Sequence, residues 1–304
     1  MSKLCDLMEG YRTIVRGLVK NAEEKVGKSG PYVNIVFTDG DQEISANMFV
    51  TIDRFPFKGK VVDLTLTIRN GYINVLNAME VVNADKAEFL PHAPIDADEA
   101  WKFIMNVICS MEDHPDIRVI VKRILSKYEE DFKKWSAAKS GHHNYVGGLI
   151  YHVYRMLQMA QGTVRAYDGL DAELLYAGVI LHDIGKLEEL QTDDVGNAVY
   201  TVNGNLFGHL YLGMKIIDDS CRAMGIDENK EDIMLLKHMI GSHHKELEYG
   251  AIRKPATLEA YVLSALDEMD SRYWIYEHES ETIETGTCSE PIRVLNGTIV
   301  YKKN

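Results

Sequence analysis

A histidine and an aspartate stand side by side in Leu181-His182-Asp183-Ile184-Gly185-Lys186, at the end of an apolar stretch. Adjacent side chains on a helix point about 100° apart, so an imidazole and a carboxylate placed in this way can hold one cation from two sides. Further groups of the same kind occur at long spacings: His152, His209, His238, His243, His244 and Asp267. We expect the chain to fold so that these groups meet His182 and Asp183.

A mixed set of imidazoles and carboxylates suits transition-metal ions better than Mg²⁺ or Ca²⁺, which prefer cages of oxygen atoms. Four groups would hold one ion, and the surplus histidines allow a second, with Asp183 as the natural bridge. We expect two divalent transition-metal ions, Mn²⁺ first, with Fe, Zn, Ni or Co as alternatives. Two ions about 3.5–4 Å apart suit phosphoester cleavage, because they acidify the attacking water and neutralise charge on the phosphoryl oxygens.

The elements that must position these groups begin with a β domain. Residues 1–90 combine short alternating stretches with hairpin-turn signals at Asp39-Gly40 and Asn70-Gly71, and a charged loop is expected over Asn21–Gly30. The expected strands are Tyr11–Val19, Tyr32–Phe37, Ile44–Val50, Val61–Ile68 and Tyr72–Val82. Five short strands in fewer than about 100 residues favour a small closed barrel, of which the OB-fold is the common type with a nucleic-acid role.

Four aromatic residues of this part have two alternative roles, stacking on nucleobases or filling the barrel core: Tyr32, Phe37, Phe49 and Tyr72. Residues 1–90 hold 11 Lys and Arg against 12 Asp and Glu, so the part is nearly neutral and can carry a local basic groove. The sequence shows no clear cluster of basic and aromatic residues of the kind that binds single strands.

The chain becomes helical after residues 91–98, a linker with two prolines. Gly208-His209 should open one helix, Ser242-His243-His244 should close another, and Asn296-Gly297 predicts a hairpin in the tail. Periodicity and capping residues predict further helices over Asp98–Met111, Pro115–Trp135, Asp171–Lys186 and Thr257–Trp274. Within Ser140–Ala160, His142, His143, Gly147 and Gly148 precede an apolar helix that carries His152. We expect a two-domain α+β protein, with a β-barrel over 1–90, an all-α domain over 99–280 and a C-terminal hairpin over 281–304.

Composition argues against several classes of protein. No apolar run reaches the roughly 18 residues of a membrane span, and no apolar core of a secretory signal follows the first charged residues. The four cysteines show no CxxC spacing, which indicates free thiols in a reducing cytoplasm. The net charge of −13 disfavours a nucleic-acid partner, but the acidic surplus lies in residues 91–304. We expect a cytoplasmic protein with no membrane partner, and the sequence leaves a homo-oligomer open.

The order His152, then His182-Asp183, then Asp267 resembles that of the HD-domain superfamily of metal-dependent phosphohydrolases, which is all-α. Other segments extend the resemblance: Ala137-Ala138-Lys139, His142-His143-Asn144-Tyr145-Val146-Gly147-Gly148-Leu149, Gly208-His209, His238–His244 and Pro291-Ile292-Arg293-Val294. Together they are similar to the YhaM family of bacterial 3′-to-5′ exoribonucleases, which joins an N-terminal OB-fold to an HD domain. The resemblance covers nearly the whole chain and is densest over 137–274.

The resemblance implies a role for each group. The first ion would be held by His152, His182, Asp183 and Asp267. The extra ligands of two-metal HD proteins match His209, His243 and His244, unless one of the last pair faces substrate. Asp183 and Lys186 are the expected catalytic residues. Lys186 either binds a phosphate group through its positive charge or is only an exposed lysine at a helix end, favoured by the helix dipole. Expected substrate contacts are Lys139, His142, His143, Lys186, His238, Arg253 and Lys254. Asp270 is expected to pair with Arg272 or with a ligand histidine.

The hypothesis from the sequence is therefore a cytoplasmic, metal-dependent 3′-to-5′ exoribonuclease that acts on single-stranded RNA, or on single-stranded DNA, and releases nucleoside 5′-monophosphates. One alternative is a phosphohydrolase of small nucleotides, which would use the same ions. The other is a nucleic-acid-binding accessory protein whose helical part is structural. An intact ligand set argues against the second alternative. Burying several ionisable groups without a metal to compensate them costs folding free energy.

Overall fold

The computed structural model describes residues 2–27, 30–90, 92–135, 145–192 and 198–304. The chain forms two compact units, one of Met1–His92 with Thr192–Val199 and one of Ala93–Gln191 with Tyr200–Asn304. In the described part of the chain, no helix is both long and apolar enough to cross a bilayer. Each unit is described by itself.

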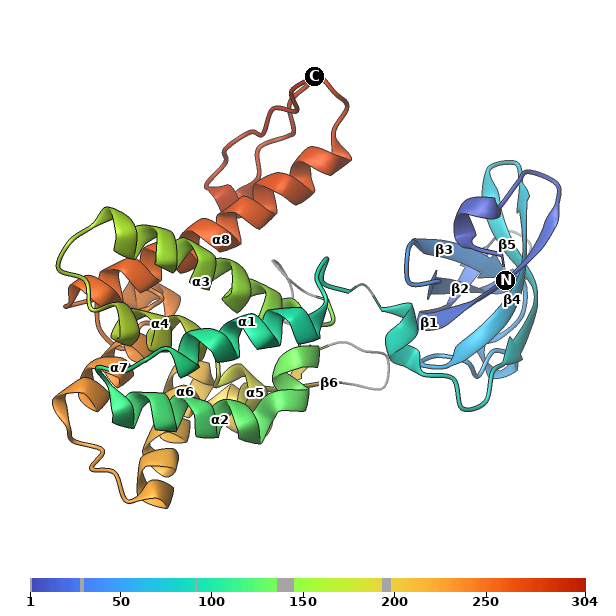
Figure 1. The fold of residues 1–304 in the computed structure, drawn as a ribbon. Coiled ribbons are helices and arrows are strands. Elements are labelled where there is room, and N and C mark those ends of the chain that lie inside the picture. Colours follow the sequence, from blue (N-terminus) through green and yellow to red (C-terminus); the bar gives the residue numbers. More distant parts are fainter. Residues whose placement is uncertain (1, 28–29, 91, 136–144, 193–197) are drawn as a thin grey trace. The chain divides into compact units, whose positions relative to one another are not determined.

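Five strands of the first unit close into a barrel, shown in blue and cyan in Figure 1: β1 (Arg12–Gly27), β2 (Gly30–Thr38), β3 (Glu43–Met48), β4 (Val61–Arg69) and β5 (Tyr72–Glu80). The order around the barrel is β1-β2-β3-β5-β4, and β4 pairs back onto β1. All neighbours are antiparallel except β3 and β5, which run parallel. The predicted five-stranded barrel is confirmed.

One part of the strand prediction is wrong, because Asn21–Gly27 continues β1 and is not a loop. Its residues are mostly exposed and charged, which hides the strand from a search for apolar alternation. The segment is held by pairing with β2, from Ala22 opposite Ile35 to Gly27 opposite Gly30. A register shift between Val19 and Asn21 marks the place where β1 leaves β4 and follows β2.

The barrel interior is apolar. Alternate residues of the strands fill it, including Val15, Val33, Ile35, Phe37, Leu64 and Leu66. Both predicted hairpin turns are confirmed, because Thr38 pairs with Glu43 across the first and Arg69 with Tyr72 across the second.

The second unit is helical, as predicted. Its helices are α1 (Ala97–Cys109), α2 (Pro115–Lys134), α3 (Gly148–Ala166), α4 (Ala172–Leu181), α5 (Lys186–Glu189), α6 (Val202–Met224), α7 (Glu231–Ser242) and α8 (Leu258–Thr282). A two-stranded sheet that the sequence did not indicate is formed by β6 (Leu190–Thr192) and β7 (Ala198–Tyr200). Short 3₁₀ helices occur at Leu4–Asp6, Ile52–Arg54, Lys86–Phe89, Leu247–Tyr249 and Arg293–Leu295.

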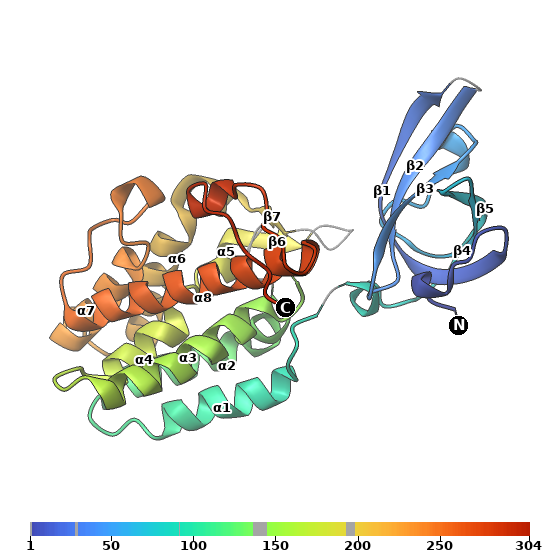
Figure 2. The same ribbon diagram turned by 90° about the horizontal axis from the view of Figure 1, so that it is seen from above.

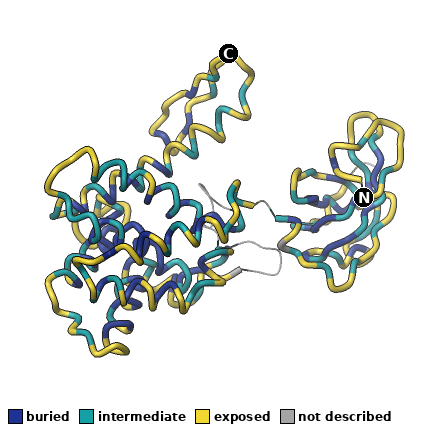
Figure 3. The backbone as a smooth tube through the Cα atoms, in the orientation of Figure 1, coloured by how far each residue is buried: buried dark blue, intermediate teal, exposed yellow. Residues whose placement is uncertain are grey.

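Helix α4 lies at the centre of this unit, packed against α3, α7 and α8 (Figure 2). Asp171 caps its N-terminus by accepting a hydrogen bond from the Leu174 backbone N–H, which satisfies one of the unpaired amides of the first turn. From Leu174 to Leu181 every residue except Tyr176 is buried, because α4 meets other helices on most of its sides. Figure 3 shows the buried segments gathered in the interior of the unit.

The C-terminal hairpin, residues 283–304, follows α8. Antiparallel bridges join Cys288 to Tyr301 and Ile292 to Thr298, and the chain reverses at Asn296-Gly297 as predicted. A 3₁₀ turn takes the place of a regular first strand. Most of the hairpin is exposed (Figure 3), and a small apolar cluster of Ile292, Leu295 and Val300 anchors it beside Ile275 of α8.

Candidate metal centre

Ligand-type side chains from five places in the helical unit converge in its interior. His152 lies on α3, His182 and Asp183 follow α4, His209 lies on α6, His243 and His244 follow α7, and Asp267 lies on α8. Their ligand atoms form three overlapping groups within 4.8 Å: His152, His182 and Asp267; His182, Asp183 and His243; and His209, His243 and His244.

The turn after α4 brings its two residues against α6. The predicted helix Asp171–Lys186 is in fact interrupted, because α4 ends at Leu181 and α5 starts at Lys186. Gly185 allows this turn to approach α6 closely, since a Cβ atom there would lie 2.0 Å from the carbonyl oxygen of His209. The glycine therefore lets His182 and Asp183 meet the ligands of α6.

A break in α6 orients His209. Gly208 has a φ of 71°, so the helix is interrupted immediately before the histidine. The backbone N–H of His209 donates to Glu189 Oε1 at 3.0 Å, and its ring Nδ1 lies 3.1 Å from the same oxygen. Glu189 thus fixes the ring with its Nε2 atom directed at the centre.

The other four histidines use Nδ1 in the same way. These Nδ1 atoms lie 2.8–2.9 Å from oxygen acceptors: Asp270 Oδ2 for His152, and the backbone oxygens of Val179, Ile240 and Tyr249 for His182, His243 and His244. An oxygen acceptor requires a proton on Nδ1, so the neutral rings carry lone pairs on Nε2. This is the tautomer in which imidazoles bind metals, with the second ring nitrogen held by an outer partner.

The Nε2 lone pairs face one another in two places. The Nε2 atoms of His152 and His182 are 3.2 Å apart, and those of His209 and His244 are also 3.2 Å apart. Two lone pairs at this distance repel unless a proton or a cation lies between them. The donor set therefore fits divalent metal ions, as the mixed ligand chemistry of the sequence indicated.

Asp183 lies between the two groups of histidines. Its Oδ2 accepts a hydrogen bond from Lys186 Nζ at 2.7 Å and lies 3.2 Å from His182 Nε2. Its buried Oδ1 has no hydrogen-bond partner among the described residues, and it lies 3.6 Å from His209 Nε2 and 3.8 Å from His243 Nε2. A carboxylate with one oxygen toward each group is placed to bridge two ions.

Charge and burial oppose each other in this centre. Burial would raise the pKa of Asp183, but Lys186 and His182 beside it hold that pKa well below its ordinary value. Burial would lower the pKa of His152, but hydrogen bonds to Asp267 and Asp270 raise it to about 9. Burial lowers the pKa of His243 well below its ordinary value, which favours the neutral ring that a metal requires.

A layer of outer groups supports these ligands, and Asp270 is the one of them that the sequence analysis named. Asp270, fully buried on α8, accepts a hydrogen bond from His152 Nδ1 through Oδ2, and its Oδ1 forms an ion pair with Arg155 Nε at 2.8 Å. Asp270 therefore pairs with a ligand histidine, whereas Arg272 pairs with Glu268 at 2.9 Å. The i, i+3 spacing of Asp267 and Asp270 was a usable signal for this pair, because both residues lie on one face of α8.

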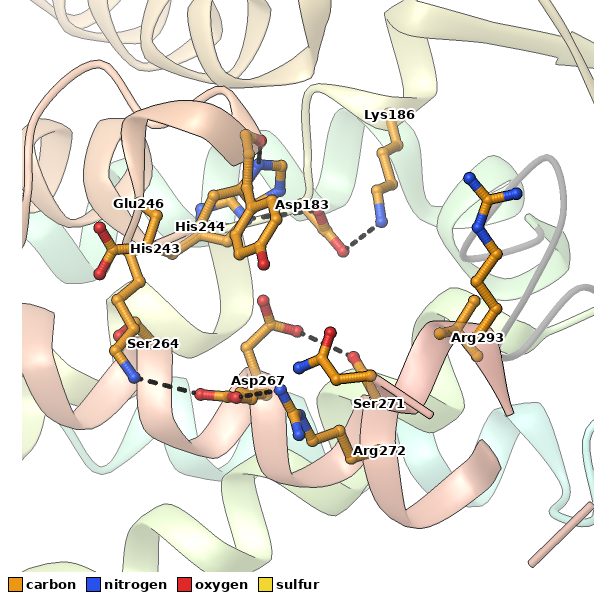
Figure 4. A pocket seen from close by; sticks show the side chains of 15 residues that line it. Asp183, Lys186, His243, His244, Glu246, Ser264, Asp267, Ser271, Arg272 and Arg293 are labelled. Atoms are coloured by element: carbon orange, nitrogen blue, oxygen red, sulfur yellow. Dashed lines mark hydrogen bonds and ion pairs between the residues drawn. The ribbon is translucent and has the colours of Figure 1, made fainter. Parts of the chain in front are cut away.

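A cavity of about 670 Å³ opens onto the centre (Figure 4). Asp183, His243, His244 and Asp267 lie in its wall. The remaining lining residues are mostly polar, among them Lys186, Lys245, Tyr249, Ser271, Arg272, Arg293 and Asn296. The cavity has room for a phosphate group and a nucleoside beside the candidate metal ligands.

The other predicted substrate contacts are placed differently. His238 Nε2 accepts a hydrogen bond from the Ala256 backbone N–H at 2.9 Å and does not line the described wall of the cavity. Lys254 lies on the surface, paired with Glu246 at 2.6 Å, and Arg253 is exposed. The expected contacts Lys139, His142 and His143 lie outside the described residues.

The barrel carries a groove of its own. This cavity of about 630 Å³ is lined by Gly27, Gly30, Tyr32, Asn47, Phe49, Arg69, Asn70, Tyr72 and Asn74. The rings of Tyr32 and Phe49 lie 6.1 Å apart, and Phe49 and Tyr72 are about two-thirds exposed. Phe37, by contrast, is fully buried in the barrel core. The fold thus brings three aromatic residues and one basic residue, Arg69, to one groove, a grouping that was not visible in the sequence.

Comparisons with known proteins agree with this arrangement. The model of the HD domain family matches residues 149–272. The chain is 30% identical over 300 residues to the 3′-5′ exoribonuclease YhaM of Halalkalibacterium halodurans, covering 94% of this chain and 92% of that protein. It is 31% identical over 303 residues to the protein of the same name from Bacillus subtilis strain 168, covering 94% and 93%. No solved structure matches the chain.

Proposed function

The chain belongs to the family of the YhaM 3′-5′ exoribonucleases, and on this premise we propose that it shortens single-stranded RNA from the 3′ end and releases nucleoside 5′-monophosphates. The observation that carries the proposal is the convergence of five histidine Nε2 atoms on Asp183 and Asp267 beside a polar cavity. The membership and the HD domain make the protein a metal-dependent phosphodiesterase.

The first ion would be held by His152, His182, Asp183 and Asp267, and the second by His209, His243 and His244 together with Asp183. Mn²⁺ is the proposed metal. Bound ions of this kind acidify an attacking water and neutralise charge that develops on the phosphoryl oxygens.

The protein groups around the ions have separate tasks in the proposed reaction. Lys186 keeps Asp183 ionised, because its ammonium group lies 2.7 Å from Oδ2, and it offers a positive charge to the scissile phosphate. Asp270 and Glu189 hold the His152 and His209 rings with Nε2 directed inward. The buried position of His182 and His243 excludes bulk water from one side of the centre, which strengthens every electrostatic interaction there.

The barrel groove is the proposed binding site for the part of the strand that is not being cleaved. Stacking on aromatic rings tolerates any base, because every nucleobase has a π-face, and Arg69 adds a positive charge for the backbone. We accordingly propose residues 1–90 as the strand-binding domain, 91–98 as the linker, 99–280 as the catalytic domain and 281–304 as the tail. A cytoplasmic location is part of the same proposal, because the substrate is cellular RNA.

The test is incubation of a short RNA bearing a 3′-hydroxyl with the protein and Mn²⁺, followed by gel electrophoresis and chromatography of the products. The wild type should shorten the RNA one nucleotide at a time and release 5′-monophosphates. Asp183→Ala should abolish the shortening. The proposal is wrong if the wild type leaves the RNA intact, or if Asp183→Ala shortens it at the wild-type rate.

A further inference from the structure

The C-terminal hairpin contributes side chains to the cavity beside the metal centre. Arg293, Val294 and Asn296 line this cavity. Their neighbours in the sequence, Ile292 and Leu295, are buried in the apolar cluster of the hairpin. Burial of these two residues fixes the 3₁₀ turn, so the remaining side chains of the turn are held toward the cavity. The hairpin is therefore a fixed wall of the cavity.

The charges of this wall differ from those of the other walls. Three further cations line the cavity, and each pairs with an acid: Lys186 with Asp183 at 2.7 Å, and Lys245 and Arg272 with Glu268 at 3.3 and 2.9 Å. The guanidinium group of Arg293 makes no hydrogen bond or ion pair with any residue in the described part of the chain. It is exposed, and Figure 4 shows its guanidinium group across the cavity from His243 and His244.

Other exposed arginines of the described chain, such as Arg12 and Arg54, also lack an acidic partner, but their side chains do not line this cavity. Arg293 combines a free guanidinium group with a position beside the candidate metal ligands. A guanidinium group presents a planar fork of donors that matches the two oxygens of a phosphate. Asn296 lies on the same wall and adds an amide, which can donate to a phosphate oxygen or to a ribose hydroxyl.

Asn296 is also fixed by the backbone. Its φ of 55° lies in the left-handed region, which asparagine adopts more readily than most residues. The Gly297 backbone N–H donates to the Ile292 carbonyl oxygen at 3.0 Å and closes the turn. The position of the amide is thus set by the same turn that presents Arg293.

We propose that Arg293 and Asn296 form a clamp for the phosphodiester next to the scissile one, so that the enzyme recognises a polynucleotide and not merely a terminal phosphoester. This assignment rests on the proposed nuclease function. Lys186 and the ions serve the scissile phosphate, because Lys186 contacts Asp183. The fork of Arg293 lies farther from Asp183 than Lys186 does in Figure 4, across the cavity from His243 and His244, where the strand would leave the centre.

The test compares two substrates that share the scissile bond. The diribonucleotide ApA has one phosphodiester, whereas hexa-adenylate has a second one for the clamp. Arg293→Ala should raise KM for hexa-adenylate about tenfold or more, the loss expected for a hydrogen bond to a charged group. It should leave turnover of ApA within about twofold of wild type. Arg293→Lys keeps the charge but not the fork of donors, so its KM for hexa-adenylate should lie between those of the wild type and Arg293→Ala.

Two matched variants complete the experiment. Lys303→Ala removes the same charge from the same exposed tail, outside the cavity lining. It should leave KM and turnover unchanged with both substrates. Asn296→Gly removes the amide while the backbone keeps its positive φ, and it should also raise KM for hexa-adenylate. If Arg293→Ala loses the same activity with ApA and with hexa-adenylate, or loses none with either, the proposed clamp is wrong.

Binding separates this inference from the proposed function. The affinity of each variant for fluorescein-labelled hexa-adenylate is measured by anisotropy with Ca²⁺ in place of Mn²⁺. Weaker binding by Arg293→Ala than by Lys303→Ala supports the clamp even if the wild type cleaves neither substrate, an outcome that would sink only the nuclease proposal. Equal binding by the two variants contradicts the clamp, whatever the activity.

Discussion

The Nε2 atoms of His152 and His182 face each other at 3.2 Å in the interior of the helical unit, while the Nδ1 atom of each ring donates to an oxygen. The two rings are therefore oriented before any ion binds, and without an ion a proton lies on the Nε2 side of the pair, in keeping with the raised pKa of His152. A bound cation would take the place of this proton. Metal binding and the stability of the helical unit should accordingly be coupled.

Removal of the metal should lower the melting temperature. At free Mn²⁺ about 100 times its Kd, binding adds about 2.7 kcal/mol to the free energy of unfolding. For a helical unit of about 200 residues this corresponds to roughly 5 to 10 °C. Differential scanning calorimetry of EDTA-treated protein, before and after addition of Mn²⁺, measures the difference. Identical melting curves would contradict a folded-state metal site.

The two members of the central pair should differ in their effect on metal content. Asp183 faces both groups of histidines, so Asp183→Asn should abolish both sites, whereas His182→Ala should weaken mainly the first. Elemental analysis after dialysis against Mn²⁺ gives the number of ions per chain. Retention of both ions by Asp183→Asn would show that the carboxylate is not a bridge.

The outer partner Asp270 should matter for affinity although it does not reach the ions. Asp270→Asn keeps the shape but weakens the hold on His152 Nδ1, and loss of such a partner typically lowers metal affinity about 10- to 100-fold. Titration calorimetry with Mn²⁺ measures the change. Asp219→Asn, an exposed change on α6, is the control and should bind Mn²⁺ as the wild type does. If Asp270→Asn binds Mn²⁺ with the affinity of the wild type, Asp270 does not support the metal site.

The barrel groove gives a separate prediction about strand binding. Tyr72→Ala and Phe49→Ala should each weaken binding of a 12-nucleotide RNA by about 1–3 kcal/mol, the value of one stacked base. Both residues are about two-thirds exposed, so the barrel should stay folded. Tyr11→Ala, equally exposed but outside the groove lining, is the matched control. Equal affinities of all three variants, measured by anisotropy, would exclude the groove.

Local sequence signals were enough for most elements of the fold. The hairpin turns at Asp39-Gly40 and Asn70-Gly71 were predicted correctly because turn residues act within a few positions. The second half of β1 was missed, since Asn21–Gly27 is exposed and is a strand only through its pairing with β2. The break between α4 and α5 was missed because it depends on the close approach of Gly185 to α6.

The candidate ligands could be found from residue type, and so could one support, Asp270, but the supports Glu189 and Arg155 could not. His182 and Asp183 are adjacent in the sequence, which made the pair visible. Glu189 and Arg155 act on ligands that come from other elements or through Asp270, so only the packing of helices identifies them. Arg293 belongs to Pro291-Ile292-Arg293-Val294, a segment that the family resemblance included. Its position in the wall of the cavity, however, depends on burial of its neighbours in the hairpin.

Stability should also depend on pH through His114, which lies far along the chain from the metal ligands. Its Nε2 lies 2.7 Å from Asp171 Oδ2, and its Nδ1 lies 3.6 Å from Asp232 Oδ2. Burial lowers the pKa of His114, but the hydrogen bonds and charges of Asp171 and Asp232 outweigh it, and the pKa is raised above its ordinary value of 6.5. Glu173, which accepts from the His114 backbone N–H, adds negative charge nearby.

A raised pKa in the folded state means that the folded protein binds the proton more tightly than the unfolded chain does. The contribution of His114 is therefore fully present below about pH 6.5 and is lost as the pH rises through the folded-state value. His114→Gln should destabilise the protein most near pH 5.5 and progressively less toward pH 9. Urea unfolding of wild type and variant, both in EDTA, gives the difference at each pH, and metal effects cancel. A difference that is constant with pH would show that the imidazole acts through packing alone.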